Sequence, residues 1–437
     1  MSLGAVVRRL RETGTAIGLG ALVGIACGAA SALFLVLLDA ATNFRGRNDA
    51  IVYALPLAGL VMGRGLEALA PAVRRGTNQI IDAINTDARG PEARVPAVLL
   101  PVVLFGTVLT HLFGGSAGRE GTAVQMGGAI GEVAARVGKA APRSGLRRQL
   151  LLAGVAGGFG SVFGTPLAGT IFALEFAARG RIPTDALLPA LVAALVGDAV
   201  TRLLGVVHTA YPAVAPVGFS AALLGKWLLF ATIVAAVTAA FLGGLALTKR
   251  WMAHHARRLP LAMAVGGLAV VILWRVTGGD AYLGLGVPTI ERAFVDPNLP
   301  ATAFLAKAAF TVLTVGSGFL GGEVTPLFFV GAALGNLLAE VLALPLSLAA
   351  GVGLVAVFAT AANTPLALCV MAVELMGAPV LGHAALVCVV ARGLVGSLGL
   401  YAAQRPAEGD DAPSPKAGGD ETRGVPAATP PSDHGAG

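Results

Sequence analysis

Two glutamates lie in hydrophobic, glycine-rich stretches of this chain and have matching neighbours. Glu120 stands in Gly-Arg-Glu-Gly-Thr and Glu323 in Gly-Gly-Glu-Val-Thr, and at an offset of 203 residues five positions of the two twelve-residue windows are identical. A carboxyl group carries a proton when neutral and accepts hydrogen bonds as an anion when ionised. Because an ionisable side chain inside a membrane is costly, two of them at corresponding positions predict an ion pathway between two repeats.

The elements that would position these glutamates are apolar segments. The chain is 56% hydrophobic and 13% charged, with a mean hydropathy of +0.79; the charged share is about half that of soluble domains. Runs long enough to span a membrane lie near residues 13–41, 50–71, 93–113, 184–206, 217–246 and 259–278. Shorter runs, many with Gly or Pro at their ends, lie near 148–163, 166–178, 301–315, 324–344, 346–361, 365–377 and 379–400. This pattern predicts an all-α polytopic membrane protein with broken, half-spanning helices.

A second internal match divides the chain. Thr-Pro-Leu-Ala at residues 165–168, followed by Glu175, recurs at 364–367, followed by Glu374. Two matches in the same order predict a duplicated membrane unit, but similarity alone leaves open whether the halves are parallel or inverted. The predicted parts are a cytoplasmic N-terminal segment, two membrane repeats and a disordered tail rich in Pro, Gly, Ala, Asp and Ser. Their ranges are 1–12, 13–206, 207–403 and 404–437.

These motifs resemble the CLC family of chloride channels and chloride–proton antiporters. Residues 118–122 are similar to the family's central Gly-Arg-Glu-Gly-Pro motif, 161–169 to the segment that follows it, and 316–322 to the start of a later anion-coordinating helix. The resemblance covers residues 13–403. It implies an inverted repeat of two helical halves, a homodimer with one pore per subunit, and an anion pathway lined by helix N-termini.

Departures from the family pattern indicate a particular branch. Chloride-conducting relatives have Gly-Ser-Gly-Ile-Pro where residues 76–80 read Gly-Thr-Asn-Gln-Ile, and Gly-Xaa-Phe-Xaa-Pro where 322–326 read Gly-Glu-Val-Thr-Pro. Both replacements are similar to the branch that exchanges fluoride for protons. The resemblance assigns an anion pathway to Asn78, Glu120, Glu323, Thr325 and Tyr401, proton coupling to Glu120 and Glu323, and pore-lining backbone to Gly118, Arg119, Gly121 and Val324.

The chemistry of fluoride agrees with this assignment. Helix N-termini offer free N–H groups and the positive end of a dipole to any anion. Fluoride is small and strongly hydrated, so it needs additional donors: the two N–H groups of Asn78, the hydroxyls of Thr325 and Tyr401, and a protonated Glu323. Glu120 would occupy an anion site when ionised and leave it when protonated, which couples proton and anion movement.

Each site residue also has a structural interpretation. Glu120 would be an ion-pair partner of Arg119, although successive helical residues do not face each other. The others have common helix-end or interface roles: a helix cap for Glu323, a helix start for Thr325, an N-cap for Asn78, and an interfacial anchor for Tyr401.

Several further residues are expected to be structural. We expect Glu175 and Glu374 to be helix-end residues, Lys307 to extend to a membrane edge or to pair there, and His111 to be a hydrogen-bonded core residue rather than a proton relay. Three cysteines without metal or redox spacing are expected in the core: Cys27, Cys369 and Cys388.

Competing functions are a chloride or nitrate exchanger, or a passive anion channel of the same fold. A membrane-embedded enzyme is not expected, because the apolar runs hold no paired aspartates, no Gly-Xaa-Ser-Xaa-Gly motif and no His-Glu-Xaa-Xaa-His motif. No cofactor, metal or nucleic-acid partner is expected. The branch assignment implies a multi-pass protein of a bacterial cytoplasmic membrane, with both termini in the cytoplasm, that expels fluoride from the cell.

Overall fold

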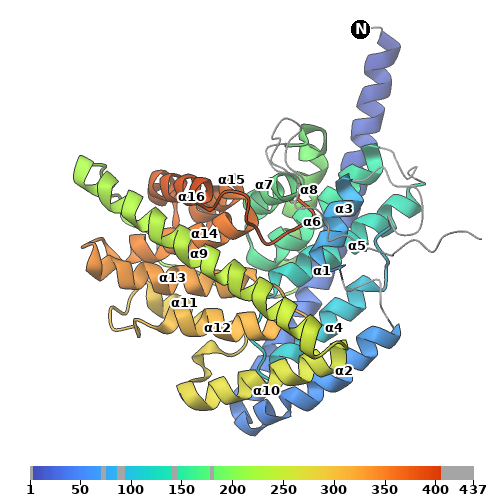
Figure 1. The fold of residues 1–437 in the computed structure, drawn as a ribbon. Helices are drawn as coiled ribbons and strands as arrows, with labels where there is room; N and C mark the ends of the chain where they lie inside the picture. Colours follow the sequence, from blue (N-terminus) through green and yellow to red (C-terminus); the bar gives the residue numbers. More distant parts are fainter. Residues whose placement is uncertain (1–2, 70–74, 86–93, 140–144, 178–181, 405–437) are drawn as a thin grey trace, which may run out of the picture.

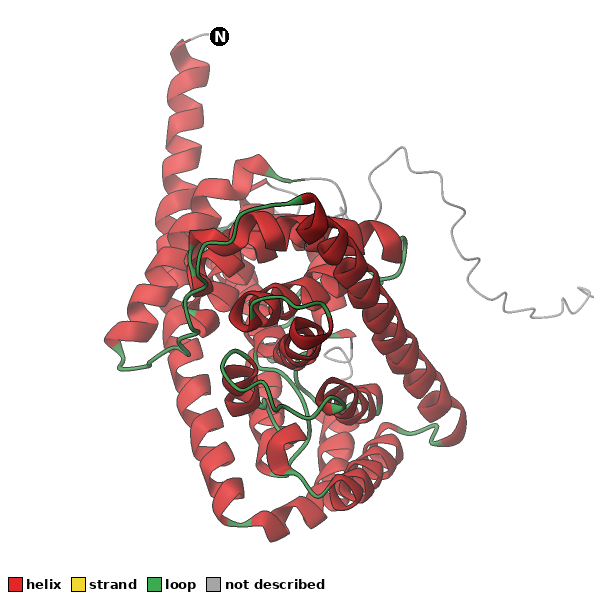
Figure 2. Ribbon diagram, turned by 90° about the vertical axis from the view of Figure 1, so that its left-hand side faces the viewer, coloured by secondary structure: helices red, strands yellow, loops and turns green. Residues whose placement is uncertain are grey.

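The computed structural model describes residues 3–69, 75–85, 94–139, 145–177 and 182–404, and these residues are almost entirely helical (Figure 1). Loops join the helices (Figure 2), and the longest described one comprises residues 204–220, between the two halves. The helices are α1 (Leu3–Arg47), α2 (Leu55–Leu69), α3 (Thr77–Asn85), α4 (Leu99–Leu112), α5 (Glu120–Val137), α6 (Gly145–Phe163), α7 (Pro166–Phe176), α8 (Leu187–Leu203), α9 (Ala221–His255), α10 (Leu259–Thr277), α11 (Val287–Ala293), α12 (Ala303–Gly316), α13 (Val324–Val341), α14 (Leu346–Ala362), α15 (Pro365–Met376) and α16 (Leu381–Val395). Short 3₁₀ turns lie at Asp49–Ala54, Thr184–Ala186, Asp280–Tyr282 and Ala378–Val380.

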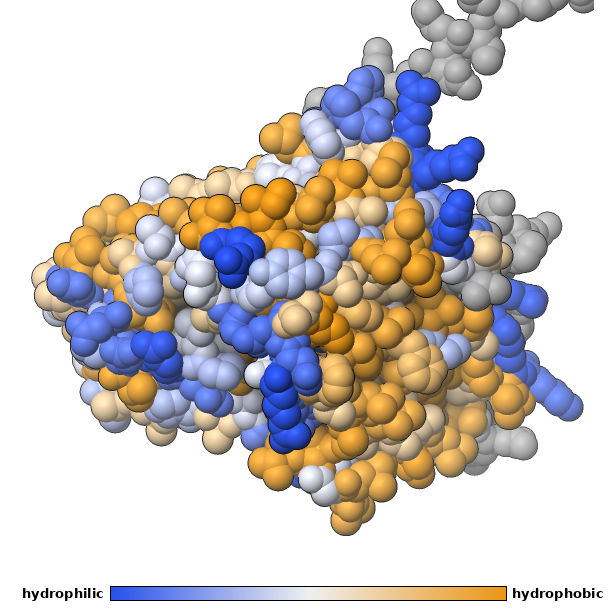
Figure 3. Space-filling model, turned by 90° about the horizontal axis from the view of Figure 1, so that it is seen from below, coloured by the Kyte–Doolittle hydropathy of each residue, from blue (hydrophilic) through white to orange (hydrophobic). Residues whose placement is uncertain are grey.

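Seven helical segments of the described residues are long and apolar enough to cross a membrane. They are Glu12–Arg47, Asp49–Ala68, Thr184–Leu203, Ala221–His255, Leu259–Thr277, Val324–Val341 and Ala378–Val395. The α13 segment is 83% buried inside the protein, whereas no other exceeds 50%, so α13 lies in the interior. Figure 3 shows a broad hydrophobic area on the face seen from below, as expected for a surface in contact with lipid.

Helix boundaries differ from the expected apolar runs at three places. α1 begins at Leu3 rather than near residue 13, so the expected N-terminal segment continues this helix. α9 continues to His255, nine residues beyond the run that was expected to end at 246. The run expected from residue 93 forms a helix only from Leu99. Hydropathy marks the part of a helix that lies in lipid, whereas a helix ends only where its backbone bonding ends.

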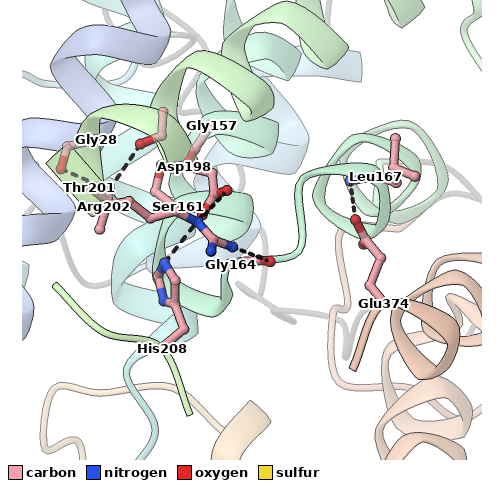
Figure 4. Close-up of polar contacts among 11 residues, drawn as sticks. Gly28, Gly157, Ser161, Gly164, Leu167, Asp198, Thr201, Arg202, His208 and Glu374 are labelled. Atoms are coloured by element: carbon pink, nitrogen blue, oxygen red, sulfur yellow. Dashed lines mark hydrogen bonds and ion pairs between the residues drawn. The ribbon is translucent and has the colours of Figure 1, made fainter. Parts of the chain in front are cut away.

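Two reciprocal contacts show that the halves are inverted. Gly118 and Gly322 form an antiparallel bridge in which each N–H donates to the other's carbonyl, at 2.6 and 2.8 Å. The carboxylate of Glu374, near the end of α15, accepts N–H bonds at the start of α7, and Glu175, near the end of α7, accepts them at the start of α15. Figure 4 shows Glu374 at Leu167. Equivalent segments therefore run in opposite directions.

The structural register of the repeat differs by one residue from the sequence match. α5 and α13 both contain 18 residues and start at Glu120 and Val324, and their N-cap residues are Arg119 and Glu323, with φ of −98° in both. The equivalent positions are therefore 204 residues apart, as they are for the bridging glycines 118 and 322. Glu120 and Glu323 are not structural equivalents, which corrects their expected correspondence. The five identities at an offset of 203 (Gly, Glu, Thr, Gly and Ala) therefore join positions that are not structurally equivalent.

Glycines allow the helices that carry the site to pack closely. A Cβ atom on Gly127 of α5 would lie 2.0 Å from the carbonyl oxygen of Gly154 on α6. In the other half, a Cβ on Gly331 of α13 would lie 2.0 Å from the carbonyl oxygen of Gly353 on α14. Close backbone contact of this kind is typical of helices that associate within membranes. It fixes the starts of α5 and α13 relative to the core.

Candidate anion and proton pathway

The N-termini of α5 and α13 meet at the centre of the protein. The Gly118–Gly322 bridge joins the two segments that lead into these helices. A Cβ on Gly121 would lie 2.8 Å from the Cα of Gly322, so neither position accommodates a side chain without a shift of the backbone. Two helix N-termini with free N–H groups therefore approach each other, an arrangement that favours an anion.

The carboxylate of Glu120 occupies this place. Its side chain is fully buried. Its Oε2 atom accepts hydrogen bonds from the backbone N–H groups of Arg119 and Thr325, both at 3.1 Å. The Thr325 hydroxyl lies 2.6 Å from each carboxylate oxygen. The negative group of Glu120 thus sits at the start of α13, where the donors of another helix surround it.

Arg119 also contacts Glu120, which corrects one expectation. Its Nε atom lies 3.4 Å from Oε1 of the carboxylate. The rule that successive helical residues do not face each other does not apply, because Arg119 is the N-cap of α5 and Glu120 is the first helical residue. The arginine side chain is 17% exposed and the glutamate side chain 0%, so Arg119 extends from the buried site toward a cavity.

That cavity, the Arg119 vestibule, has a volume of about 910 Å³. Its charged lining residues carry both signs: Asp39, Arg45, Arg119, His208, Asp280, Glu291 and Arg292. His208 contacts Asp198 at 3.2 Å, and Arg202 donates to the same carboxylate at 2.9 and 3.1 Å (Figure 4). The sequence analysis missed this cluster, because its members belong to α8 and to the segment between the repeats.

A second cavity, the Asn78 vestibule, has a volume of about 320 Å³. Three of the expected site residues line it: Asn78, Glu323 and Tyr401. Glu120 and Thr325 line neither of these two cavities with their side chains, and Arg119 lines the other one. The expected residues therefore form two groups, with the buried Glu120–Thr325 pair on α5 and α13 and the remaining three side chains around the Asn78 vestibule.

Asn78 lies within the first turn of α3, which begins at Thr77, so the residue is not an N-cap. Its side-chain oxygen accepts a hydrogen bond from the backbone N–H of Ala403 at 3.0 Å. This contact joins α3 to the end of the second half of the chain. It uses the acceptor of the amide and leaves the two amide N–H donors for other partners.

Glu323 and Tyr401 differ from their structural interpretations. Glu323 is the N-cap of α13, but its side chain makes no capping hydrogen bond. Tyr401 is only 5% exposed, so it is not an interfacial anchor. Its ring packs edge-on against Phe176 with a centroid distance of 6.1 Å. Gln404, assigned to the tail from sequence, is also buried and donates to the carbonyls of Phe176 and Ala362; residues 405–437 lie outside the described residues.

Buried polar residues support the central site from α4. His111 is fully buried, and its ring nitrogens lie 2.8 and 2.9 Å from the carbonyl oxygens of Thr107 and Ala117. This geometry confirms a hydrogen-bonded core histidine. The Thr107 hydroxyl bonds to that of Thr122 at 2.7 Å. Thr122 stands where the family motif has proline, and its hydroxyl joins α5 to α4.

Lys307 does not extend to a membrane edge. Its side chain is fully buried, and the ammonium donates to the carbonyl oxygens of Tyr282 and Gly284 at 3.1 and 2.6 Å. It also lies over the ring of Phe329 on α13, 5.4 Å from the centroid. Because backbone carbonyls and a ring face satisfy the charge, the lysine holds the loop before α11 against α13. The three cysteines are buried, as expected.

Comparisons with known proteins agree with this geometry. Residues 58–396 match the sequence family described as voltage gated chloride channel. A chloride/fluoride channel protein of Pseudomonas syringae pv. tomato is 44% identical over 402 residues, 89% of this chain and 86% of that protein. The crystal structure of a CLC-type fluoride/proton antiporter matches with a TM-score of 0.85 and 33% identity, covering 90% of this chain and 98% of the other. A slow cyanobacterial Cl⁻/H⁺ antiporter has the same fold, with a TM-score of 0.75 and 20% identity over 87% and 94% of the two chains.

Proposed function

This chain belongs to the voltage-gated chloride channel (CLC) family of anion and proton transporters, and on this premise we propose that it exports fluoride in exchange for protons. The observation that carries the proposal is the Glu120 carboxylate at the start of α13, bonded to the N–H and hydroxyl of Thr325. A carboxylate in this position stands in for a transported anion, because it uses the same kind of donors that an anion needs.

Proton exchange follows from competition for these donors. While Glu120 is ionised, its oxygens hold the Thr325 and Arg119 donors and exclude another anion. Protonation removes the charge and converts one oxygen into a donor, so the side chain leaves and fluoride takes its place. Loss of the proton to the opposite side brings the carboxylate back. Each cycle therefore exchanges an anion for a proton.

Fluoride selectivity is assigned to the residues of the Asn78 vestibule. Fluoride accepts strong hydrogen bonds and loses more hydration free energy than chloride, so a selective route needs donors placed close together. The two amide N–H donors of Asn78 have no partner among the described residues, Tyr401 has a hydroxyl, and Glu323 becomes a donor when protonated. Two relatives described above are named for fluoride, which supports this choice over chloride.

The Asn78 vestibule is assigned to the cytoplasmic side of a bacterial inner membrane. The end of α9 and the turn into α10 carry four basic residues, Lys249, Arg250, Arg257 and Arg258, and the first of them lines this vestibule. Positive charge is enriched on the cytoplasmic side of membrane proteins. Arg45, near the end of α1, lines the opposite vestibule. A continuous helix of 45 residues is about 67 Å long, so the start of α1 lies on the cytoplasmic side.

A homodimer is also part of the proposal, with its interface on the face of α7, α8, α15 and α16. Leucines on these helices are about half exposed, among them Leu167, Leu195 and Leu366. Glu175 and Glu374 are only partly buried beside them. Because a carboxylate in contact with lipid is costly, a second copy of the chain is the better cover for this face.

The test uses purified protein in liposomes under a fluoride or a chloride gradient, with internal pH recorded. We expect fluoride efflux to drive proton uptake and chloride to move far more slowly. Equal fluoride and chloride flux would support the chloride–proton exchanger, and fluoride flux without proton movement would support the passive channel.

A further inference from the structure

The Asn78 vestibule contains a lysine to which neither the sequence motifs nor the exchange cycle assigns a role. The charged residues that line this cavity are Arg75, Lys249 and Glu323. Arg75 forms an ion pair with Asp82. Lys249 is exposed, and it has no ion-pair or hydrogen-bond partner among the residues that the structure describes. Its ammonium group is therefore available to interact with ions that enter the cavity.

Lys249 reaches this position because α9 extends beyond its apolar run. The run ends near residue 246, but the helix continues to His255 without a glycine or proline to break it. The final turns therefore project past the membrane-spanning part, beside the start of α10, where Leu259 also lines the vestibule. Lys249 therefore lines the vestibule from the part of α9 that lies beyond the apolar run.

The positive charge of Lys249 counters the negative charge of Glu323 in the same cavity. Glu323 lines the same cavity, and its carboxylate repels any anion that approaches from this side. The electrostatic attraction between Lys249 and Glu323 offsets this repulsion. In a cavity bounded by low-dielectric protein, a positive charge in the lining also raises the concentration of anions around it. An ammonium group is compact and strongly hydrated, so it attracts an anion without the two-point binding that arginine provides.

We propose that Lys249 is the anion-recruiting residue of the Asn78 vestibule, which draws fluoride from the cytoplasm and neutralises the Glu323 carboxylate during its approach. The identity of the anion rests on the function proposed above, whereas the recruiting role rests on the cavity and its charges. Arg250 provides a matched control, because it carries the same charge on the next residue of α9, is exposed, and does not line the cavity.

The experiment measures fluoride uptake by everted membrane vesicles, in which the cytoplasmic face meets the bath and all molecules have one orientation. The apparent KM for fluoride is compared for the unmodified protein and for Lys249→Gln, Lys249→Arg and Arg250→Gln. Each protein is measured at about 0.01 M and about 1 M of an impermeant salt, where the screening length is roughly 30 and 3 Å. Vesicles without the protein give the background.

We expect Lys249→Gln to raise the KM about three- to tenfold in low salt, with little change in maximal rate, and to match the unmodified protein in high salt. Lys249→Arg and Arg250→Gln keep the original KM, and right-side-out vesicles show no effect of Lys249→Gln. The proposal is overturned if the KM does not change, if its change is independent of salt, or if Arg250→Gln has the same effect.

Failure of the proposed function gives a different result, since the unmodified protein then shows no fluoride uptake above background. If it transports chloride instead, the same comparison with chloride tests Lys249 directly. A salt-dependent KM shift then supports the recruiting role, and its absence contradicts it.

Discussion

A single carboxylate connects the two helices that meet at the centre of this protein. Glu120 is the first residue of α5, yet its strongest contacts are with Thr325 of α13. A Cβ on Gly118 would lie 3.0 Å from Oε2 of the carboxylate, so glycine leaves just enough space for the group. Hydrogen bonds from Arg119 and Thr325 are stronger to an ionised carboxylate than to a protonated carboxyl group.

We predict that Glu120→Gln abolishes proton coupling. The amide has nearly the same shape but cannot bind and release a proton in the physiological range. Proton uptake driven by a fluoride gradient should fall to the rate of protein-free liposomes, as recorded by an internal pH dye. Glu291→Gln, an exposed change in the Arg119 vestibule, should keep normal coupling. Unchanged proton uptake in Glu120→Gln would remove this residue from the cycle.

Candidate site residues could be selected from the sequence, but their contacts could not be predicted. Glu120 and Glu323 were selected because carboxylates are rare in apolar stretches, and Thr325 was selected from the resemblance to the fluoride-exchanging branch. Nothing in the motif indicates that Thr325 donates to Glu120 across the two halves. The contact between Arg119 and Glu120 was excluded by a rule that is valid only inside a helix. Side-chain pairing depends on the residue at which each helix begins. The sequence shows that a segment is apolar more reliably than it shows this starting residue.

Helices α7 and α15 are joined by reciprocal hydrogen bonds, because a glutamate near the end of each accepts N–H bonds from the start of the other. Each begins with a proline after a threonine and carries, near its end, the glutamate that caps the other. The four N–H bonds to the two carboxylates have lengths of 2.7–3.1 Å. The sequence analysis assigned these glutamates to helix ends. It did not show that each caps the opposite repeat, because this needs the inverted orientation that similarity leaves open.

The reciprocal caps predict matched losses of stability. Glu175→Ala and Glu374→Ala should each lower the free energy of unfolding by about 1–3 kcal/mol, because each leaves two helix N–H groups without their charged acceptor. The measurement is reversible unfolding in mixed micelles. Glu340→Ala, an exposed change on the last turn of α13, should alter the stability by less than about 0.5 kcal/mol. A large loss in only one of the two cap variants would contradict the symmetric role.

At the scale of the whole molecule, the two vestibules lie on either side of the joined N-termini of α5 and α13. Charged residues of both signs line each vestibule, and the Asn78 vestibule also has the amide and hydroxyl donors of Asn78 and Tyr401. Apolar composition was enough to predict a membrane protein with broken helices. The cavities were not predictable, since they form between segments such as α3 and residues 400–401 that lie far apart in sequence.

The proposed dimer face predicts a difference between two equally exposed leucines. Leu366 on α15 and Leu268 on α10 are both 51% exposed. Leu366→Trp should convert the dimer to a monomer, because a bulky ring separates two closely packed surfaces, whereas Leu268→Trp should leave it intact in contact with lipid. Size-exclusion chromatography with light scattering in detergent distinguishes the two states. Dissociation by Leu268→Trp alone would place the interface on another face.

The Gly118–Gly322 bridge sets a limit on how such a chain can diversify. Backbone N–H and carbonyl groups join the two halves at this bridge, and no side chain takes part in its two hydrogen bonds. Space around the bridge is the constraint, because a Cβ added at Gly121, Gly321 or Gly322 would lie 2.8 Å or less from another atom. Substitutions of pathway side chains that spare these glycines should therefore leave the backbone crossing of the two halves in place, whichever ion the pathway accepts.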